Sequence, residues 1–144
     1  MKTAVVAVLL AAGISASADL AGVKAEPNLE KRSRLALENA DRALKDAREA
    51  YNKGEMKQAE NLVAEVRESV ALAGISLKET GKDPRKSPKW FKRAEIQTRD
   101  LIRKLDAFDR EMNVADRPML AEAKAKVQQV HDDLLVGVME GKPR

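Results

Sequence analysis

The chain has 144 residues, a net charge of +4 and no cysteine, so disulfide bonds cannot hold it together. Aromatic residues make up 3% of the sequence and charged residues 35%. Many Lys, Arg, Glu and Asp combined with Leu, Val and Ala are typical of long helices and not of a β-sandwich. The length is enough for one domain with a core of its own. We therefore predict an all-α fold.

Residues 1–18 predict a secretory signal peptide. Lys2 precedes an apolar run over residues 4–14, and Ala16 and Ala18 give the small-x-small ending of such a signal. The run is shorter than the about 20 apolar residues that span a bilayer, so we expect it to be removed and not to anchor the protein. Cleavage after Ala18 predicts export, to the periplasm if the cell has two membranes and otherwise to the medium. The mature chain should contain no transmembrane segment.

Residues 19–27 mix small and charged residues without periodicity, and we expect them to be flexible. The next four segments carry apolar residues three and four positions apart, the pattern of amphipathic helices. They predict helices at about 28–52, 55–80, 88–113 and 117–140. Asn28, Ser87 and Asp116 are expected to cap the first, third and fourth of these helices. A glycine follows the first, second and fourth helix, as is common at helix ends.

The apolar stripes of the four predicted helices define the expected core. Its members are Leu37, Ala40, Leu44, Ala47, Tyr51, Met56, Ala59, Val63, Val66, Val70, Ala73, Leu77, Phe91, Ala94, Thr98, Leu101, Leu105, Phe108, Met112, Leu120, Ala123, Val127, Val130, Leu134 and Val138. Similar helix lengths and short first and third connections predict an antiparallel up-down-up-down four-helix bundle over residues 28–141.

Acid–base pairs four residues apart are expected to mark the solvent-exposed faces of these helices. The pairs are Glu38 with Arg42, Asp41 with Lys45, Glu95 with Arg99, Asp106 with Arg110 and Glu122 with Lys126. Each contributes only about 0.2 to 0.5 kcal/mol, so burial of the apolar stripes must stabilise the fold.

The first predicted hairpin resembles a tetratricopeptide repeat over about a fifth of the chain. The matching residues are Ala47, Tyr51, Gly54, Met56, Ala59 and Val63. The two halves of the chain also correspond at a constant offset, a pattern that heptads alone can produce. The corresponding residues are Leu44, Ala47, Tyr51 and Val66 in the first half and Leu105, Phe108, Met112 and Val127 in the second. As a whole, the chain is similar to small exported helical-bundle proteins of bacteria, a resemblance that implies no particular activity.

Side chains able to perform chemistry are few. A di-metal site in a helical bundle needs Glu-x-x-His on two helices, but the chain has one histidine, and Gln128 stands where its glutamate would be. His131 is followed by two aspartates, and consecutive helical residues diverge by about 100°, so we interpret the group His131, Asp132 and Asp133 as a solvated helix face.

Carboxylates elsewhere, such as Glu65 and Glu68, are assigned to mixed-charge faces without an apolar pocket. Neither a nucleophile elbow nor a phosphate-binding loop occurs in the sequence. We therefore expect no enzymatic activity, no cofactor and no metal.

Positive charge is concentrated in residues 82–93, which hold six cations and one acid, a net of +5. The chain from residue 19 carries 26 Lys and Arg against 23 acids, a net of +3, which leaves −2 for the remainder. Lys89, Lys92 and Arg93 fall in the first two turns of the third predicted helix, where the helix dipole disfavours cations by about 0.3 to 1 kcal/mol each. A helix start surrounded by cations is suited to bind an anion.

These residues predict an anion-binding site formed by Lys82, Arg85, Lys86, Lys89, Trp90, Lys92 and Arg93. A solubilising loop is the alternative interpretation, and Trp90 either fixes the loop to the bundle or presents its indole to a membrane or a sugar.

Two functions follow as hypotheses. The first is a non-catalytic interaction or scaffold protein of the cell envelope, whose partner is another envelope protein. The second is a protein that uses residues 82–93 to bind an anion or an anionic lipid or polysaccharide surface. Nucleic acid is the less favoured partner, because export separates the protein from the genome.

Overall fold

The computed structural model describes residues 17–141, and all secondary structure in this range is helical. The all-α prediction is confirmed. The elements are α1 (Ser17–Lys24), α2 (Leu29–Asn52), α3 (Met56–Glu79), α4 (Pro88–Glu111), the 3-10 helix η1 (Val114–Leu120) and α5 (Ala121–Glu140). Residues 1–16, which contain most of the predicted signal peptide, lie outside the described range.

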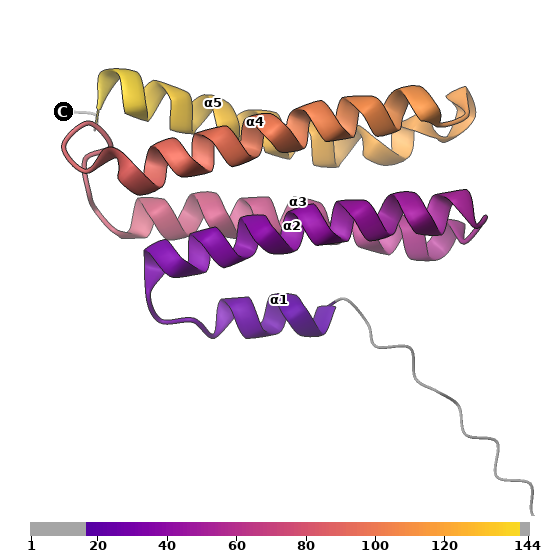
Figure 1. Ribbon diagram of the computed structural model, residues 1–144, viewed down its shortest axis with the longest axis horizontal. Helices are drawn as coiled ribbons and strands as arrows, with labels where there is room; N and C mark the ends of the chain where they lie inside the picture. The colour runs from indigo at the N-terminus through magenta and orange to yellow at the C-terminus, as the bar shows by residue number, and fades with distance from the viewer. Residues whose placement is uncertain (1–16, 142–144) are drawn as a thin grey trace, which may run out of the picture.

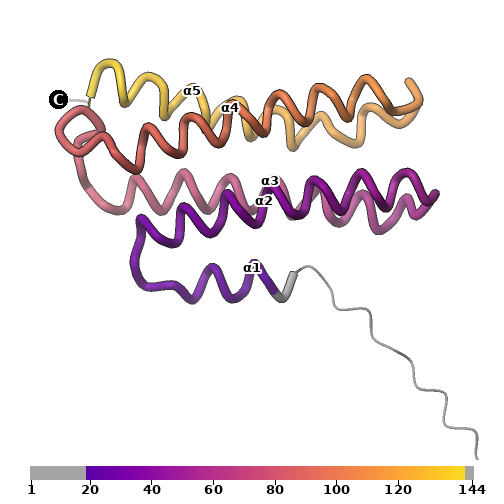
Figure 2. Tube along the Cα trace, viewed as in Figure 1, coloured from indigo at the N-terminus to yellow at the C-terminus, as the bar shows by residue number. Residues whose placement is uncertain are grey.

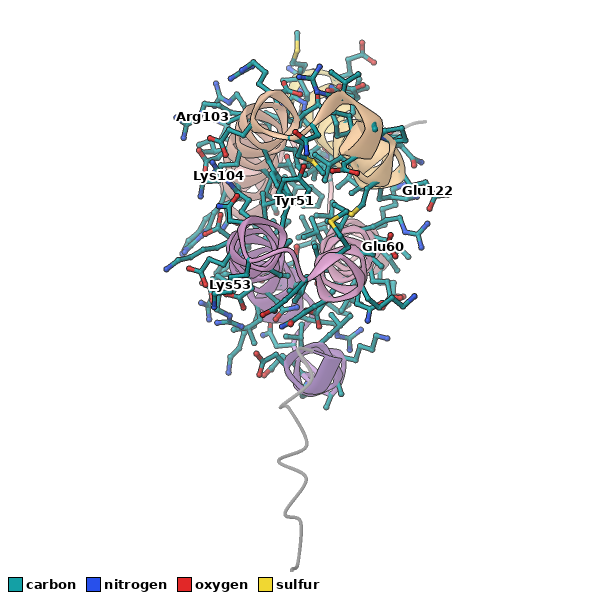
Figure 3. All side chains as sticks on the ribbon, turned by 90° about the vertical axis from the view of Figure 1, so that its right-hand side faces the viewer. Tyr51, Lys53, Glu60, Arg103, Lys104 and Glu122 are labelled. Atoms are coloured by element: carbon teal, nitrogen blue, oxygen red, sulfur yellow. The ribbon has the colours of Figure 1, made fainter. Side chains whose placement is uncertain are left out.

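The helices form layers (Figure 1). α2 and α3 make one antiparallel hairpin, α4 and α5 make a second hairpin stacked on it, and α1 lies along the opposite side of the first hairpin. The Cα trace shows the same path of the chain (Figure 2). The end view places α4 above α2 and α5 above α3 (Figure 3). Helices of the same direction therefore pack against each other across the two layers.

Consecutive long helices pack on each other within each hairpin but hardly across the connection between the hairpins. Across the two layers, α3 packs on α5, whereas α3 and α4, which are consecutive, touch little. The connection over residues 80–87 is long enough to carry the chain diagonally across the stack. The correspondence between the halves fits this stack, because Leu44 and Leu105 lie on the parallel helices α2 and α4, and Val66 and Val127 on α3 and α5.

The hairpin of α2 and α3 is the most extensive contact between helices. α2 contributes a row of buried alanines, whose small side chains let the two helix backbones approach closely: Ala36, Ala40, Ala43, Ala47 and Ala50. Two buried hydrogen bonds cross this contact. Ser33 Oγ donates to the carbonyl oxygen of Ala73, and Asn39 Nδ2 donates to Ser69 Oγ, both over 3.0 Å.

The larger side chains of the core lie where the two hairpins meet. Phe108, Leu44, Leu105, Val66 and Val127 are all at most 1% exposed. Every member of the expected core is buried except Tyr51, Met56 and Val138, which are partly exposed. The predicted apolar stripes are therefore confirmed.

The expectation that residues 19–27 are flexible is wrong for the first part of that segment, which belongs to α1. Leu20 and Val23 are three residues apart, so they lie on one side of this helix, and both are buried. They pack the helix onto α2 and α3. Two apolar residues among small and charged ones are too weak a signal for a helix, and the packing surface that selects this conformation comes from the other layers.

The expected helix caps are only partly correct. Asn28 Oδ1 accepts a hydrogen bond from the backbone N–H of Lys31 over 2.8 Å, as predicted. The side chain of Ser87 makes no such bond at the start of α4. The fourth long helix begins at Ala121 and not near residue 117, because Pro118 lacks a backbone N–H and the chain follows the tighter turns of η1 first.

The charged side chains pair between helices more than along them. Of the five expected pairs, Glu95 with Arg99 forms, at 3.4 Å. The other carboxylates find partners elsewhere: Asp41 binds Lys104 at 2.5 Å, Asp106 binds Lys124 at 3.1 Å, Glu122 binds Arg67, and Glu38 binds Arg34 at 2.8 Å. Three of these ion pairs connect different helices, so the polar surface joins the layers.

Tyr51 joins the two hairpins at one end of the stack, where it is labelled in Figure 3. Its hydroxyl donates to Asp116 Oδ2 over 2.8 Å and accepts from the backbone N–H of Asn113 over 3.0 Å. Its ring meets Phe108 edge to face, with 5.7 Å between centroids. The residue therefore fixes the connection between α4 and η1 against the end of α2.

We predict that Tyr51→Phe lowers the free energy of unfolding by about 1 to 3 kcal/mol, because two hydrogen bonds are lost while the ring contact stays. Urea unfolding followed by circular dichroism measures the change. In a background of Asp116→Ala, the same substitution should cost less, since one of its two partners is already absent. Equal stability of Tyr51→Phe and the unaltered protein would show that this contact does not hold the hairpins together.

Candidate functional site

The predicted anion-binding residues lie at the end of the molecule where α3 ends, α4 begins and α5 ends (Figure 1). They extend from the connection over residues 80–87 into the first turns of α4. The structure divides them into three groups with different surroundings.

Lys82 and Arg85 have contacts within the protein. The ammonium of Lys82 pairs with the carboxylate of Glu30 on α2. The side chain of Arg85 lies against the end of α5, where a Cβ added to Gly141 would come within 3.0 Å of Arg85 Cδ. A cation at a helix C-terminus is favoured by the helix dipole. Both residues therefore fix the connection to its neighbours, and binding of an external anion would compete with those contacts.

Trp90 lies half-buried against the core, as expected if it fixes the loop to the helices. Lys89 Nζ lies 5.1 Å from the centroid of its ring, and Arg93 Cζ lies 5.9 Å from it. Both distances are within the range of cation–π attraction. The indole thus holds two cations side by side at the start of α4.

Lys86 and Lys92 are exposed and form no ion pair within residues 17–141. Lys89 and Arg93 likewise form no ion pair within this range and contact the ring of Trp90. We refer to Lys86, Lys89, Lys92 and Arg93 as the α4 cation group. The backbone N–H groups at the start of α4 lie in the same region and lack a side-chain cap from Ser87. This arrangement can bind an anion through charge and backbone donors together.

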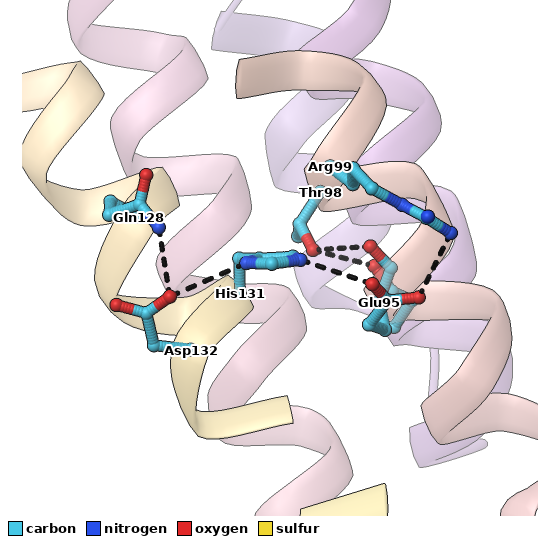
Figure 4. A network of polar contacts seen from close by, with 7 residues as sticks. Glu95, Thr98, Arg99, Gln128, His131 and Asp132 are labelled. Atoms are coloured by element: carbon cyan, nitrogen blue, oxygen red, sulfur yellow. Dashed lines mark hydrogen bonds and ion pairs between the residues drawn. The ribbon is translucent and has the colours of Figure 1, made fainter. Parts of the chain in front are cut away.

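His131 is not on a solvated face, contrary to the expectation for the group His131, Asp132 and Asp133. Its side chain is 12% exposed and points from α5 toward α4 (Figure 4), where Nε2 lies 3.1 Å from Glu95 Oε1. Nδ1 lies 3.4 Å from Asp132 Oδ1. Asp133 instead pairs with Lys78 on α3, at 3.6 Å.

The contacts around His131 continue on both sides of the ring. Glu95 also binds Arg99, and Gln128 Nε2 donates to Asp132 Oδ1 over 2.8 Å (Figure 4). The network joins α4 to α5. Within residues 17–141, no three His, Asp or Glu side chains converge as metal ligands would. The network around His131 therefore serves to hold α4 and α5 together in the second hairpin.

Glu65 also departs from the expectation that it lies on a mixed-charge face. Its side chain is buried, and neither carboxylate oxygen has a hydrogen-bond partner in the described structure. Burial raises the pKa of this carboxyl above its ordinary value of 4.5, and the charges of Asp19 and Glu68 raise it further. The folded carboxyl therefore holds its proton to a higher pH than an exposed glutamate does.

A groove between α3 and α5 is a feature that the sequence motifs did not indicate. It has a volume of about 560 Å³ and is closed on the inside by Leu77, Phe91 and Leu134. Ile75 and Val136 also line it, and both are more than half exposed. They lie off the apolar stripes that define the core. Apolar residues outside the apolar stripe of a helix are the signal by which the groove could have been predicted from the sequence.

Comparison with known proteins adds nothing to this geometry: no protein family, no curated protein and no solved structure matches the chain. Among the described residues, none of the helices combines the length and the apolar character that crossing a membrane requires.

The environment of Glu65 predicts a pH-dependent stability. The folded carboxyl keeps its proton to a higher pH than the unfolded one, so above about pH 4.5 the unfolded state loses a proton that the folded state retains. The free energy of unfolding should therefore fall as the pH rises from this value through the raised pKa. Glu65→Gln, which cannot ionise, should be more stable than the unaltered protein at pH 8 and gain less at pH 4.

Urea unfolding at the two pH values measures this difference. Glu60→Gln is the matched control, because Glu60 is an exposed glutamate on the same helix. If Glu65→Gln raises the free energy of unfolding by no more at pH 8 than at pH 4, Glu65 does not occupy a buried environment that raises its pKa.

Proposed function

We propose that the protein is a non-catalytic, exported interaction protein of the cell envelope, an antiparallel four-helix bundle once a signal peptide has been removed after Ala18. Its contact is with an anionic membrane surface, through the α4 cation group. The observation that carries this proposal is the gathering of four exposed cations without acidic partners around the first turns of α4. An anion there relieves the repulsion among these cations and satisfies the free N–H groups of the helix start.

Two exposed apolar side chains favour a lipid surface over a polysaccharide. Leu135 and Met139 are 39% and 68% exposed, and they follow His131 on one face of α5 at intervals of four residues. His131 reaches Glu95 on α4, and Lys92 precedes Glu95 by three residues, on the same side of α4. Apolar and cationic side chains thus share the outer face of the second hairpin. This combination is typical of proteins that lie on anionic membranes.

We predict that Lys86, Lys89, Lys92 and Arg93 changed together to Gln weaken binding to phosphatidylglycerol vesicles at least about a hundredfold, since each cation near an anionic surface contributes about 1 kcal/mol. Co-sedimentation of the full chain at low and high salt measures this loss and its salt dependence. The control changes Lys45, Lys53, Lys57 and Arg110 to Gln, which removes the same charge toward the opposite end.

Equal losses in the two quadruple variants would mean that net charge alone governs binding. If neither the unaltered protein nor the variants bind these vesicles, the scaffold hypothesis, with an envelope protein as partner, takes precedence.

A second prediction separates a lipid surface from a soluble polyanion. Leu135→Ser combined with Met139→Ser should weaken vesicle binding about tenfold, because apolar side chains no longer enter the interface. Binding to dextran sulfate should stay unchanged. Val114→Ser, at an apolar residue 74% exposed in η1, is the control. Unchanged vesicle binding by the double variant would contradict the membrane part of the proposal.

A further inference from the structure

Two close contacts lie along the groove between α3 and α5. A Cβ added to Gly74 would lie 3.2 Å from a methyl group of Val130, so α3 and α5 are in tight contact at that point. Toward the ends of the helices, Pro84 lies against Gly137, where an added Cβ would come within 3.1 Å of the proline ring. The groove along these contacts has a volume of about 560 Å³. This volume is within the range of small-molecule sites in proteins, roughly 300 to 1,000 Å³.

The walls and the floor of the groove are apolar. Phe91, from α4, and Leu77 and Leu134, from α3 and α5, form a buried base. Ile75 and Val136 line the groove and are 53% and 51% exposed. A ligand that covers them removes aliphatic surface from water, which is favourable by about 25 cal/mol per Å².

Charge is found at the rim of the groove. Lys78 on α3 and Asp133 on α5 form an ion pair of 3.6 Å between the two helices that flank it, and both side chains are largely exposed. Lys82 and Lys126 also line the groove. An exposed ion pair is worth little, so the ammonium of Lys78 can exchange Asp133 for the anion of a ligand. Lys82 already pairs with Glu30, so Lys78 and Lys126, set against Asp133, give the rim its preference for a negatively charged group.

We propose that this groove binds a linear aliphatic chain that ends in an anionic group, as in a fatty acid or a lysophospholipid. A chain of this kind places its apolar part along Ile75, Leu77 and Val136 and its anion beside Lys78. A ligand with polar atoms along its length would leave them without hydrogen-bond partners on the apolar walls. The site is separate from the α4 cation group, because none of the four members of that group lines the groove. The proposal therefore does not depend on binding to a membrane surface.

The test uses the full chain and the fluorescent fatty acid cis-parinaric acid. Ile75→Glu and Val136→Glu each place a carboxylate at an exposed position of the groove and are expected to weaken binding at least about tenfold. Ile96→Glu makes the same change at an isoleucine of similar exposure outside the groove and is expected to leave binding unchanged. The apolar run at residues 4–14 is present in every variant, so any probe that it binds contributes equally to each measurement. Circular dichroism checks that each variant is folded.

A second arm tests the charged end of the ligand. Lys78→Gln should weaken binding of the acid about tenfold and leave displacement of the probe by the corresponding fatty alcohol unchanged. Competition by oleate and by lysophosphatidylglycerol then shows whether a fatty acid or a lysophospholipid is the preferred ligand. The proposal is overturned if cis-parinaric acid does not bind, or if the groove variants and Ile96→Glu bind it equally.

Discussion

The burial of aliphatic side chains between two stacked hairpins is the interaction on which the rest of this structure depends. There is no cysteine to form a disulfide, and aromatic residues are rare. Leu44, Val66, Leu105 and Val127 meet in the middle of the stack and exclude water from it. The alanines of α2 let α3 approach closely enough for this packing to be continuous. Ion pairs between helices and the hydroxyl of Tyr51 then fix the relative position of layers that the apolar core brings together.

The diagonal connection over residues 80–87 determines where the functional features lie. Because α4 returns across the stack to lie on α2, its first turns come next to the end of α3 and the end of α5. Lys82 and Arg85 hold this connection in place, through Glu30 and through the end of α5 at Gly141. The same path places Phe91 beneath α3 and α5, where it forms the floor of their groove. One connection thus creates both the cationic end and the groove beside it.

Whether a polar residue is buried or exposed in this protein depends on helices that are distant from it in the sequence. His131 stands between two helices and contacts a carboxylate 36 positions away in the chain. Glu65 is buried although its neighbours along α3 include exposed charged residues. In the group predicted as one anion site, Lys82 pairs with Glu30 and Arg85 lies against the end of α5, whereas the other four cations form no ion pair in the described structure. Local sequence did not distinguish these cases, because the distinction lies in which helix is opposite.

The sequence by itself determined the helical class, the approximate limits of three long helices and most of the residues that form the core. It could do so because the spacing of apolar residues records which side of each helix is buried. In addition, the side chain of Asn28 binds a backbone N–H close by in the chain, and Pro88 and the glycines act through their own backbone. The tertiary structure decided that α2 lies on α4 and α3 on α5, that residues 17–24 are helical, and that α5 begins at Ala121. It also decided the environments of Glu65 and His131 and the existence of the groove. These features depend on contacts between segments far apart in the chain, and an apolar stripe specifies that a face is covered but not which helix covers it.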